Sequence, residues 1–128
     1  LDQTQEFEGG TRSDIVLPGF QSMLLDELRV HAKTLVVVLV GGSAMAVPWV
    51  ERSADAALWV GYGGEEAGTA LADVLFGDVS PSGKLPMTWY TGLEQLPPFA
   101  SMDMQAPPGR TYRFLRSSPL YTFGFGLS

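Results

Sequence analysis

Two glutamates near the start of the chain are the leading candidates for chemistry. Glu6 and Glu8 lie in a polar stretch and are followed directly by Gly9 and Gly10. A carboxylic acid with a raised pKa can protonate a leaving oxygen, and the resulting carboxylate can then activate a water molecule. A glycine-flanked loop is suited to presenting such a group. On residue type alone, however, two solvent-exposed loop acids are the more common arrangement.

A second glycine-rich segment offers a different chemistry. In Gly61-Tyr-Gly-Gly-Glu-Glu-Ala-Gly68, glycines come before a predicted helix, as they do in phosphate-binding loops. Glu65 and Glu66 would repel an anion there, and the spacing fits neither the P-loop nor the dinucleotide-binding pattern. We interpret the segment as a tight strand–helix turn. A flavodoxin-like ligand-binding domain is therefore disfavoured.

Ser43 raises the possibility of a serine nucleophile. Gly41-Gly-Ser-Ala-Met45 follows a predicted strand but lacks the final glycine of a nucleophile elbow. The single histidine, His31, comes earlier, at the end of a predicted helix. We expect His31 to interact with the last carbonyl groups of that helix. A serine hydrolase is therefore disfavoured.

The elements that must position these residues follow from hydrophobic periodicity. Apolar residues at helical spacing predict helices, and short β-branched or aromatic runs predict strands. The helices are expected at 20–33, 47–53 and 65–76, and the strands at 34–40, 56–62, 87–90 and 110–115. This order predicts an α/β fold, namely a three-layer α/β sandwich with a mostly parallel sheet. A first strand is expected just before residue 1, so the sheet is expected to be incomplete.

Composition excludes several classes of function. The chain has 128 residues, a net charge of −6 and only 17% charged residues. The acidic balance argues against nucleic acid and against anionic membrane surfaces. The longest apolar run, 35–40, is too short to span a bilayer. No cysteine and one histidine disfavour a metal site, and no cofactor is expected. The low charge fraction suits a chain that buries surface against a partner.

The aromatic residues receive structural interpretations. Trp59 falls within a buried strand pattern and is expected in the core. Trp89 and Tyr90 close a short predicted strand, so we expect them at a domain interface rather than as a stacking platform for a ligand. Tyr121 and the rest of 120–128 are expected to form a closing strand packed on the core.

Several long motifs together resemble one family. They are Leu1-Asp-Gln-Thr-Gln-Glu-Phe-Glu-Gly-Gly-Thr-Arg-Ser-Asp14, Leu17-Pro-Gly-Phe-Gln21, Gly61-Tyr-Gly-Gly-Glu-Glu-Ala-Gly68, Ala70-Leu-Ala-Asp-Val-Leu-Phe-Gly-Asp78, Pro81-Ser-Gly-Lys-Leu-Pro-Met-Thr-Trp-Tyr90, Gly109-Arg-Thr-Tyr-Arg-Phe114 and Tyr121-Thr-Phe-Gly-Phe-Gly-Leu-Ser128. In this order and spacing they resemble the C-terminal domain of family 3 glycoside hydrolases over nearly the whole chain. The stretch through Gly83-Lys-Leu-Pro-Met-Thr-Trp-Tyr90 and Pro108-Gly-Arg-Thr-Tyr-Arg-Phe114 is most similar to the β-xylosidase and α-L-arabinofuranosidase branch.

The resemblance implies a retaining β-glycosidase whose active site is shared between two domains. An N-terminal barrel, which residues 1–128 do not contain, would supply an aspartate nucleophile and most sugar contacts. The present chain, part of the C-terminal sandwich domain, would supply the acid/base glutamate. The implied partners are a carbohydrate substrate and the barrel, on the same or a separate chain. By itself the chain is expected to be inactive.

The resemblance also assigns roles to residues. Glu6 and Glu8 match the loop that carries the acid/base glutamate, and Glu6 is preferred. The family usually has Asp-Arg where this chain has Thr11-Arg12, so Arg12 is expected to order this loop without its acidic neighbour. An alternative stays open, in which the chain is a non-catalytic structural or partner-binding module derived from the same domain. The compartment also stays open.

Overall fold

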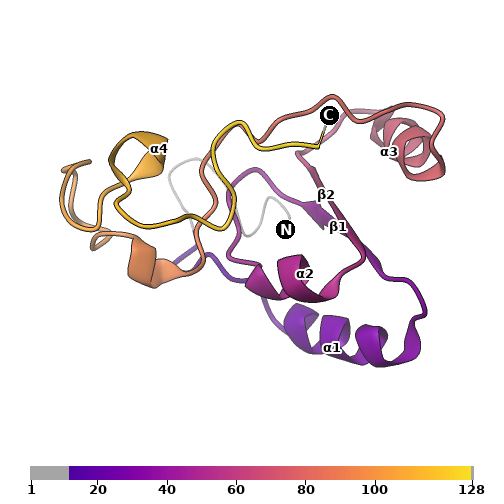
Figure 1. The fold of residues 1–128 in the computed structure, drawn as a ribbon, viewed down its shortest axis with the longest axis horizontal. Helices are drawn as coiled ribbons and strands as arrows, with labels where there is room; N and C mark the ends of the chain where they lie inside the picture. The colour runs from indigo at the N-terminus through magenta and orange to yellow at the C-terminus, as the bar shows by residue number, and fades with distance from the viewer. Residues whose placement is uncertain (1–11, 128) are drawn as a thin grey trace.

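A computed structural model of the protein describes residues 12–127 of the chain. Its longer elements run in the order α1 (Gln21–His31), β1 (Val36–Val40), α2 (Pro48–Ser53), β2 (Ala56–Val60) and α3 (Ala67–Phe76) (Figure 1). Two short elements follow, the 3-10 helix η1 (Leu93–Gln95) and the helical turn α4 (Thr111–Phe114). The predicted α/β class is confirmed.

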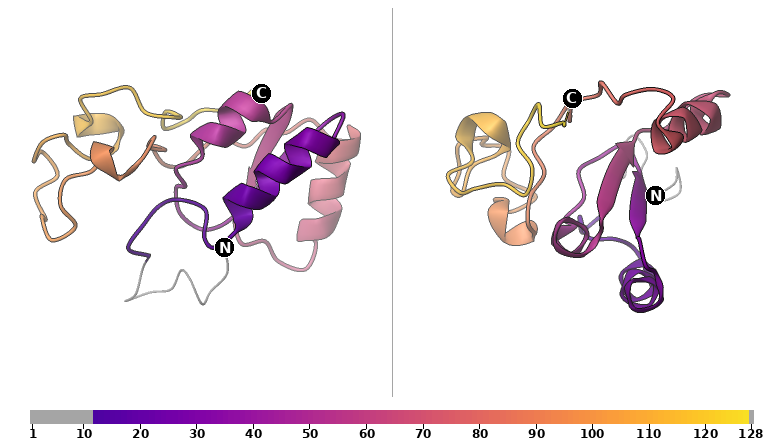
Figure 2. Two further views of the ribbon diagram at one scale, coloured as in Figure 1. Left: turned by 90° about the horizontal axis from the view of Figure 1, so that it is seen from below. Right: turned by 45° about the vertical axis from the view of Figure 1, so that its right-hand side comes forward.

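The two strands form a parallel pair with a helix between them in sequence. Val36 lies opposite Ala56, and the register continues to Val40 opposite Val60. Helices α1 and α2 lie on one side of the strands, and α3 lies on the other side (Figure 2). Parallel strands joined through a helix are the βαβ arrangement that the sequence order predicts. Within residues 12–127 the sheet has two strands.

Local chemistry explains where the helices begin and end. Pro48 occupies the first turn of α2, where its missing N–H costs nothing. Gly77 ends α3 in a left-handed conformation, with φ of 87°. Helix α3 begins at Ala67, so Glu65 and Glu66 precede it and belong to the turn rather than to the predicted helix.

The core gathers between β1, the loop before α2 and the later chain. Its buried members are Leu35, Val37, Leu39, Met45, Val47, Val50, Trp89 and Leu120. Trp89 is only 1% exposed, and its ring meets the edges or faces of Trp59 and Tyr121 at centroid distances of 6.2 and 6.1 Å. The expectation that Trp89 lies at a domain interface is wrong, because these two aromatic neighbours enclose it. Trp59 packs against this core as predicted.

The C-terminal third departs most from the predicted strands. In the described part of the segments predicted as strands at 87–90 and 120–127, the pairing reduces to one antiparallel bridge between Trp89 and Tyr121. The predicted strand at 110–115 is wrong, because Thr111–Phe114 is helical. Two positive φ angles, 94° at Gly109 and 60° at Thr111, turn the chain here. The Thr111 N–H donates to the Tyr90 hydroxyl at 2.9 Å, which holds the turn in place.

Candidate functional site

The most suitable place for chemistry is the edge of the sheet where both strands end. Because β1 and β2 are parallel, Val40 and Val60 finish side by side. The Gly41 N–H donates to the Val60 carbonyl at 3.2 Å, which continues the pairing beyond the strands. Open α/β sheets bind ligands at the carboxyl ends of their strands. We call this end of β1 and β2 the carboxyl edge.

Residues 12–17 are fastened to the loop that leaves β1 at the carboxyl edge. The Arg12 guanidinium donates to Ser43 Oγ at 3.1 Å and to the Ala44 carbonyl at 3.4 Å, and its other amino group donates to the Val16 carbonyl at 3.0 Å. The Ala46 N–H also donates to the Ile15 carbonyl at 2.7 Å. We call the contacts of Arg12 with Ser43 and Ala44 the carboxyl-edge latch.

Asp14 shapes the same segment from within. Its Oδ1 accepts from the backbone N–H groups of Ile15 at 2.6 Å and Val16 at 3.1 Å. A carboxylate that accepts from the residue two positions on forms an Asx turn. The turn directs the chain from Arg12 toward α1 and leaves the Arg12 side chain facing the loop after β1.

The latch has the character of a structural contact. Arg12 is half-buried, and a hydrogen bond from a charged donor contributes about 1.5–3 kcal/mol. The expected loop-ordering role of Arg12 agrees with this geometry. The two glutamates expected to do the chemistry, Glu6 and Glu8, lie outside the described residues. They precede Arg12 by six and four positions in the sequence.

Ser43 takes part in the latch rather than in a nucleophile elbow. Its Oγ accepts from Arg12, whereas His31 ends α1 on the way into β1, at the other end of the strand. The His31 Nε2 is hydrogen-bonded with Glu27 Oε1 at 2.9 Å, and this contact takes the place of the expected one with the last helix carbonyls. The sequence alone does not reveal the Ser43 contact, because its partner lies 31 positions away.

The glycine-rich turn after β2 has a steric reason. A Cβ on Gly63 would overlap the Ala67 Cβ, so the turn into α3 requires glycine at this position. Glu66 occupies the N-cap position of α3 without a side-chain hydrogen bond to the helix, and both glutamates are exposed. Their negative charge at this helix start disfavours a phosphate ligand.

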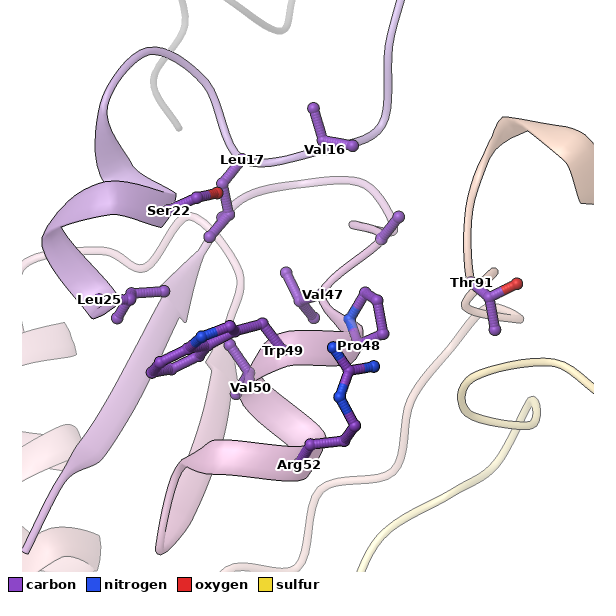
Figure 3. Close-up of a pocket in the computed structure, with 11 residues that line it drawn as sticks. Val16, Leu17, Ser22, Leu25, Val47, Pro48, Trp49, Val50, Arg52 and Thr91 are labelled. Atoms are coloured by element: carbon purple, nitrogen blue, oxygen red, sulfur yellow. The ribbon is translucent and has the colours of Figure 1, made fainter. Parts of the chain in front are cut away.

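A hollow of about 220 Å³ lies where segment 12–17 meets helices α1 and α2 (Figure 3). Its walls are mainly apolar and include Val16, Leu17 and Leu25. Trp49 forms part of the wall and donates through Nε1 to Asp26 Oδ1 at 2.6 Å, which fixes the indole. The hollow thus shares one wall with the segment that the latch fastens.

Other candidate classes find no support among residues 12–127. No group of three or more histidine, cysteine, aspartate or glutamate side chains is placed to hold a metal ion in this part of the chain. None of the helices in the described part is both long and apolar enough to cross a membrane. Tyr112 is 68% exposed, and its ring lies tilted against that of Phe123 with centroids 5.0 Å apart. Both residues are far from Arg12 and Ser43 in the sequence.

Comparison with known proteins identifies the family. Residues 1–128 match the family model described as the glycosyl hydrolase family 3 C-terminal domain. The chain belongs to glycoside hydrolase family 3. The motifs that suggested this family in the sequence are therefore correctly interpreted.

The family 3 relatives include β-xylosidases. The chain is 41% identical over 133 residues to a β-xylosidase/α-L-arabinofuranosidase 1 of Medicago sativa subsp. varia, with 96% of the chain covered. It is 43% identical over 122 residues to a xylan 1,4-β-xylosidase of Xylanibacter ruminicola, with 95% covered. The chain spans only 17% and 14% of the length of these two curated relatives.

A solved β-glucosidase structure has the same fold. The crystal structure of a β-glucosidase from Kluyveromyces marxianus matches with a TM-score of 0.81 and 32% sequence identity. The match covers 94% of this chain and 15% of that one. The described chain therefore has the architecture of one part of a much longer glycosidase.

Proposed function

We propose that this chain supplies the acid/base half of a retaining β-glycosidase and that Glu6 is the acid/base residue. In this proposal an N-terminal barrel, on the same or another chain, supplies an aspartate nucleophile and most of the sugar contacts. Membership of family 3 supports the reaction class. The carboxyl-edge latch supports the location, since it fastens the segment after Glu6 and Glu8 to the edge where α/β sheets bind ligands.

The first step joins the sugar to the barrel. The nucleophile carboxylate attacks the anomeric carbon, and the bond from that carbon to the leaving oxygen breaks. The Glu6 carboxylic acid gives its proton to this oxygen, so the aglycone leaves as a neutral alcohol. Glu6 becomes a carboxylate, and the sugar is held as a glycosyl ester.

The second step returns both carboxyl groups to their starting state. The Glu6 carboxylate takes a proton from water while the water oxygen attacks the anomeric carbon. The ester bond to the nucleophile breaks, and the sugar leaves with retained configuration. Glu6 must be protonated in the first step and ionised in the second. A pKa raised toward the working pH suits this cycle.

Substitution of each glutamate tests the assignment. In the full-length enzyme, Glu6→Gln should reduce kcat/KM strongly for a phenyl glycoside, whose leaving group needs a proton. It should change kcat/KM little for a dinitrophenyl glycoside, whose leaving group departs without help. Azide, which attacks the glycosyl ester without a base, should restore kcat of the variant for the dinitrophenyl glycoside. If Glu8→Gln shows this pattern and Glu6→Gln does not, the acid/base residue is Glu8.

The proposed substrates are β-D-xylosides or α-L-arabinofuranosides in preference to β-glucosides. The printed names of the Medicago and Xylanibacter relatives, at 41% and 43% identity, favour this branch over the β-glucosidase at 32%. The kcat/KM values for nitrophenyl β-D-xyloside, α-L-arabinofuranoside and β-D-glucoside compare the three classes. A dominant β-glucoside activity would contradict this part of the proposal.

The isolated chain should not turn over glycosides, because the two-carboxylate route needs a nucleophile from the barrel. Nitrophenol release by the 128-residue polypeptide is the measurement. Appreciable release that Glu6→Gln abolishes would show that the chain carries both catalytic groups.

A non-catalytic partner-binding module is the second candidate. The observation in its favour is the amount of exposed apolar surface, including Phe20 at 81% and Phe76 at 85%. Such surface suits a chain that is covered by another domain. Full activity after substitution of both Glu6 and Glu8 would favour this function over the acid/base role.

A further inference from the structure

The carboxyl-edge latch joins two segments that have very different surroundings. On one side stands Arg12, close in sequence to the two candidate acids. On the other side stands Ser43, on the loop that leaves the buried strand β1. That loop is firmly held, because Met45 and Ala46 are only 1% and 7% exposed. The latch thus ties the start of the described chain to the core.

Chain geometry limits how far the acids can lie from the latch. A residue advances at most about 3.6 Å along an extended chain, so four residues of chain span at most about 14 Å and six residues at most about 22 Å. A fixed point at Arg12 therefore limits the range of any chain that precedes it. Loss of this fixed point would lengthen the free chain, since the next fixed point lies farther along the chain.

We propose that Arg12 and Ser43 are positioning residues that hold the acid/base segment in place for proton transfer to the leaving group. This inference rests on the proposed function of Glu6 or Glu8. The Arg12 guanidinium is suited to this task, since it donates in one plane to Ser43 Oγ, the Ala44 carbonyl and the Val16 carbonyl. Lysine has the charge but lacks this planar fork.

The kinetic consequence is specific to proton transfer. A small misplacement of a catalytic group can cost on the order of 100-fold in rate. If the latch positions the acid, its loss should slow only the substrates whose leaving oxygen needs a proton. A merely structural role would instead lower the amount of folded enzyme and reduce activity on all substrates alike.

The test measures kcat/KM for phenyl and dinitrophenyl glycosides in the full-length enzyme. Arg12→Gln and Ser43→Ala should lower kcat/KM for the phenyl glycoside by tenfold to on the order of 100-fold and change it little for the dinitrophenyl glycoside. Ser43→Thr, which keeps the hydroxyl, should recover most of the loss. Arg12→Lys should fall between wild type and Arg12→Gln.

Arg29→Gln is the matched control for Arg12. Arg29 likewise donates hydrogen bonds through its guanidinium, to the Ser53 carbonyl, to Asp55 and to the Ala32 carbonyl, but it lies at the opposite end of the strands. Arg29→Gln should lower thermal stability. It should not change kcat/KM for the phenyl glycoside more than for the dinitrophenyl glycoside. Ser80→Ala, at an exposed serine beyond α3, is the control for Ser43→Ala.

The outcomes separate this inference from the proposed function. If Glu6→Gln or Glu8→Gln discriminates between leaving groups but Arg12→Gln and Ser43→Ala do not, the latch has no positioning role. Equal losses on both substrates, as in Arg29→Gln, would overturn it as well. If neither glutamate variant discriminates, the proposed function itself fails. The inference is supported if a glutamate variant and both latch variants, Arg12→Gln and Ser43→Ala, lower kcat/KM for the phenyl glycoside much more than for the dinitrophenyl glycoside.

Discussion

At the scale of single residues, Gly109 shows how one backbone position can determine a local fold. Its φ is 94°, and a Cβ there would overlap the carbonyl oxygen of Phe114. The close approach lets Arg116 N–H donate to the Pro108 carbonyl at 3.1 Å, which closes the loop around α4. Any side chain at Gly109 therefore has to displace backbone rather than a flexible side chain.

Gly109→Ala is expected to reduce the free energy of unfolding by about 3 kcal/mol, because strain and overlap act together. Urea denaturation followed by circular dichroism measures this. Gly124→Ala is the control, since Gly124 has φ of 81° but nothing near the position of its Cβ. Gly124→Ala should lower the free energy of unfolding by about 1–2 kcal/mol, which is the cost of the left-handed backbone conformation alone. Equal losses would show that overlap with Phe114 contributes nothing.

Asp55 is the residue that links stability to pH. Its Oδ2 accepts from the Leu35 N–H at 2.7 Å and from Arg29 at 2.7 Å. The backbone hydrogen bond from Leu35, followed by that from Arg29, lowers the pKa of this carboxyl below its ordinary value of 3.8. A lowered pKa in the folded state means that the contribution is present above the unfolded pKa. It is lost as the pH falls through the folded pKa.

Asp55→Asn should therefore be less stable than wild type at neutral pH, and the difference should shrink as the pH falls below about 4. Denaturant unfolding of both proteins between neutral and strongly acidic pH gives the difference at each pH. A difference that stays constant down to the most acidic pH would show that ionisation of Asp55 does not contribute.

At the scale of elements, β1 is a strand with one buried side. Val37 and Leu39 are each 7% exposed, whereas Val36 and Val40 are each 43% exposed. The alternation follows from the period of two in a strand. It departs from the fully buried strand that the continuous apolar run predicts, because Val36 and Val40 on the second side remain partly exposed.

Leu39→Ala is expected to lower the free energy of unfolding by about 2–5 kcal/mol, because it leaves a cavity in the core. Val36→Ala, on the exposed side of the same strand, should stay within about 1 kcal/mol of wild type. Chemical denaturation of the two variants is the comparison. Similar losses at both positions would mean that the second side of β1 is also covered.

The elements with strong periodicity could be predicted from sequence, and the others could not. The three longer helices, α1 to α3, and the strands β1 and β2 were predicted within about two residues of their ends, since apolar spacing and glycine or proline signals agree there. The predicted strand at 110–115 failed because its conformation depends on Tyr90, about twenty positions earlier. A pattern within a short window does not contain such a contact.

The residues of the candidate site could also be predicted from the sequence only in part. Glu6 and Glu8 follow only from family resemblance, because residue type alone does not separate a catalytic acid from a loop acid. Arg12 could be expected to order the loop, but its partner Ser43 could not be predicted. Trp89 was misplaced because no local pattern shows that Trp59 and Tyr121 enclose it.

At the scale of the whole molecule, exposed apolar side chains are spread over several elements. They include Phe20 before α1, Val36 on β1, Phe76 at the end of α3 and Phe99 in the later loop. The sheet within residues 12–127 has only two strands, and the edges of so small a sheet carry backbone groups that can pair with another chain. Both features suit a chain that works against a larger partner surface.

The isolated chain is expected to self-associate as its concentration rises. Val36→Lys, which places a charge on the exposed side of β1, should shift the molecule toward monomer. Val30→Lys adds the same charge on α1, where Val30 is 77% exposed, and should have less effect. Sedimentation equilibrium over a range of concentrations distinguishes these outcomes. A wild-type chain that stays monomeric throughout would contradict the expectation.

The aromatic contacts around Trp89 also give the protein an optical signature. Trp59 belongs to β2, Trp89 to the middle of the chain and Tyr121 to its end, and Tyr121 stacks further on Phe125 with centroids 5.0 Å apart. Rings held at fixed angles in an asymmetric setting produce near-ultraviolet circular dichroism, which disappears when packing is lost. That band therefore reports, without any attached dye, whether the last residues are seated against the strands during folding or assembly.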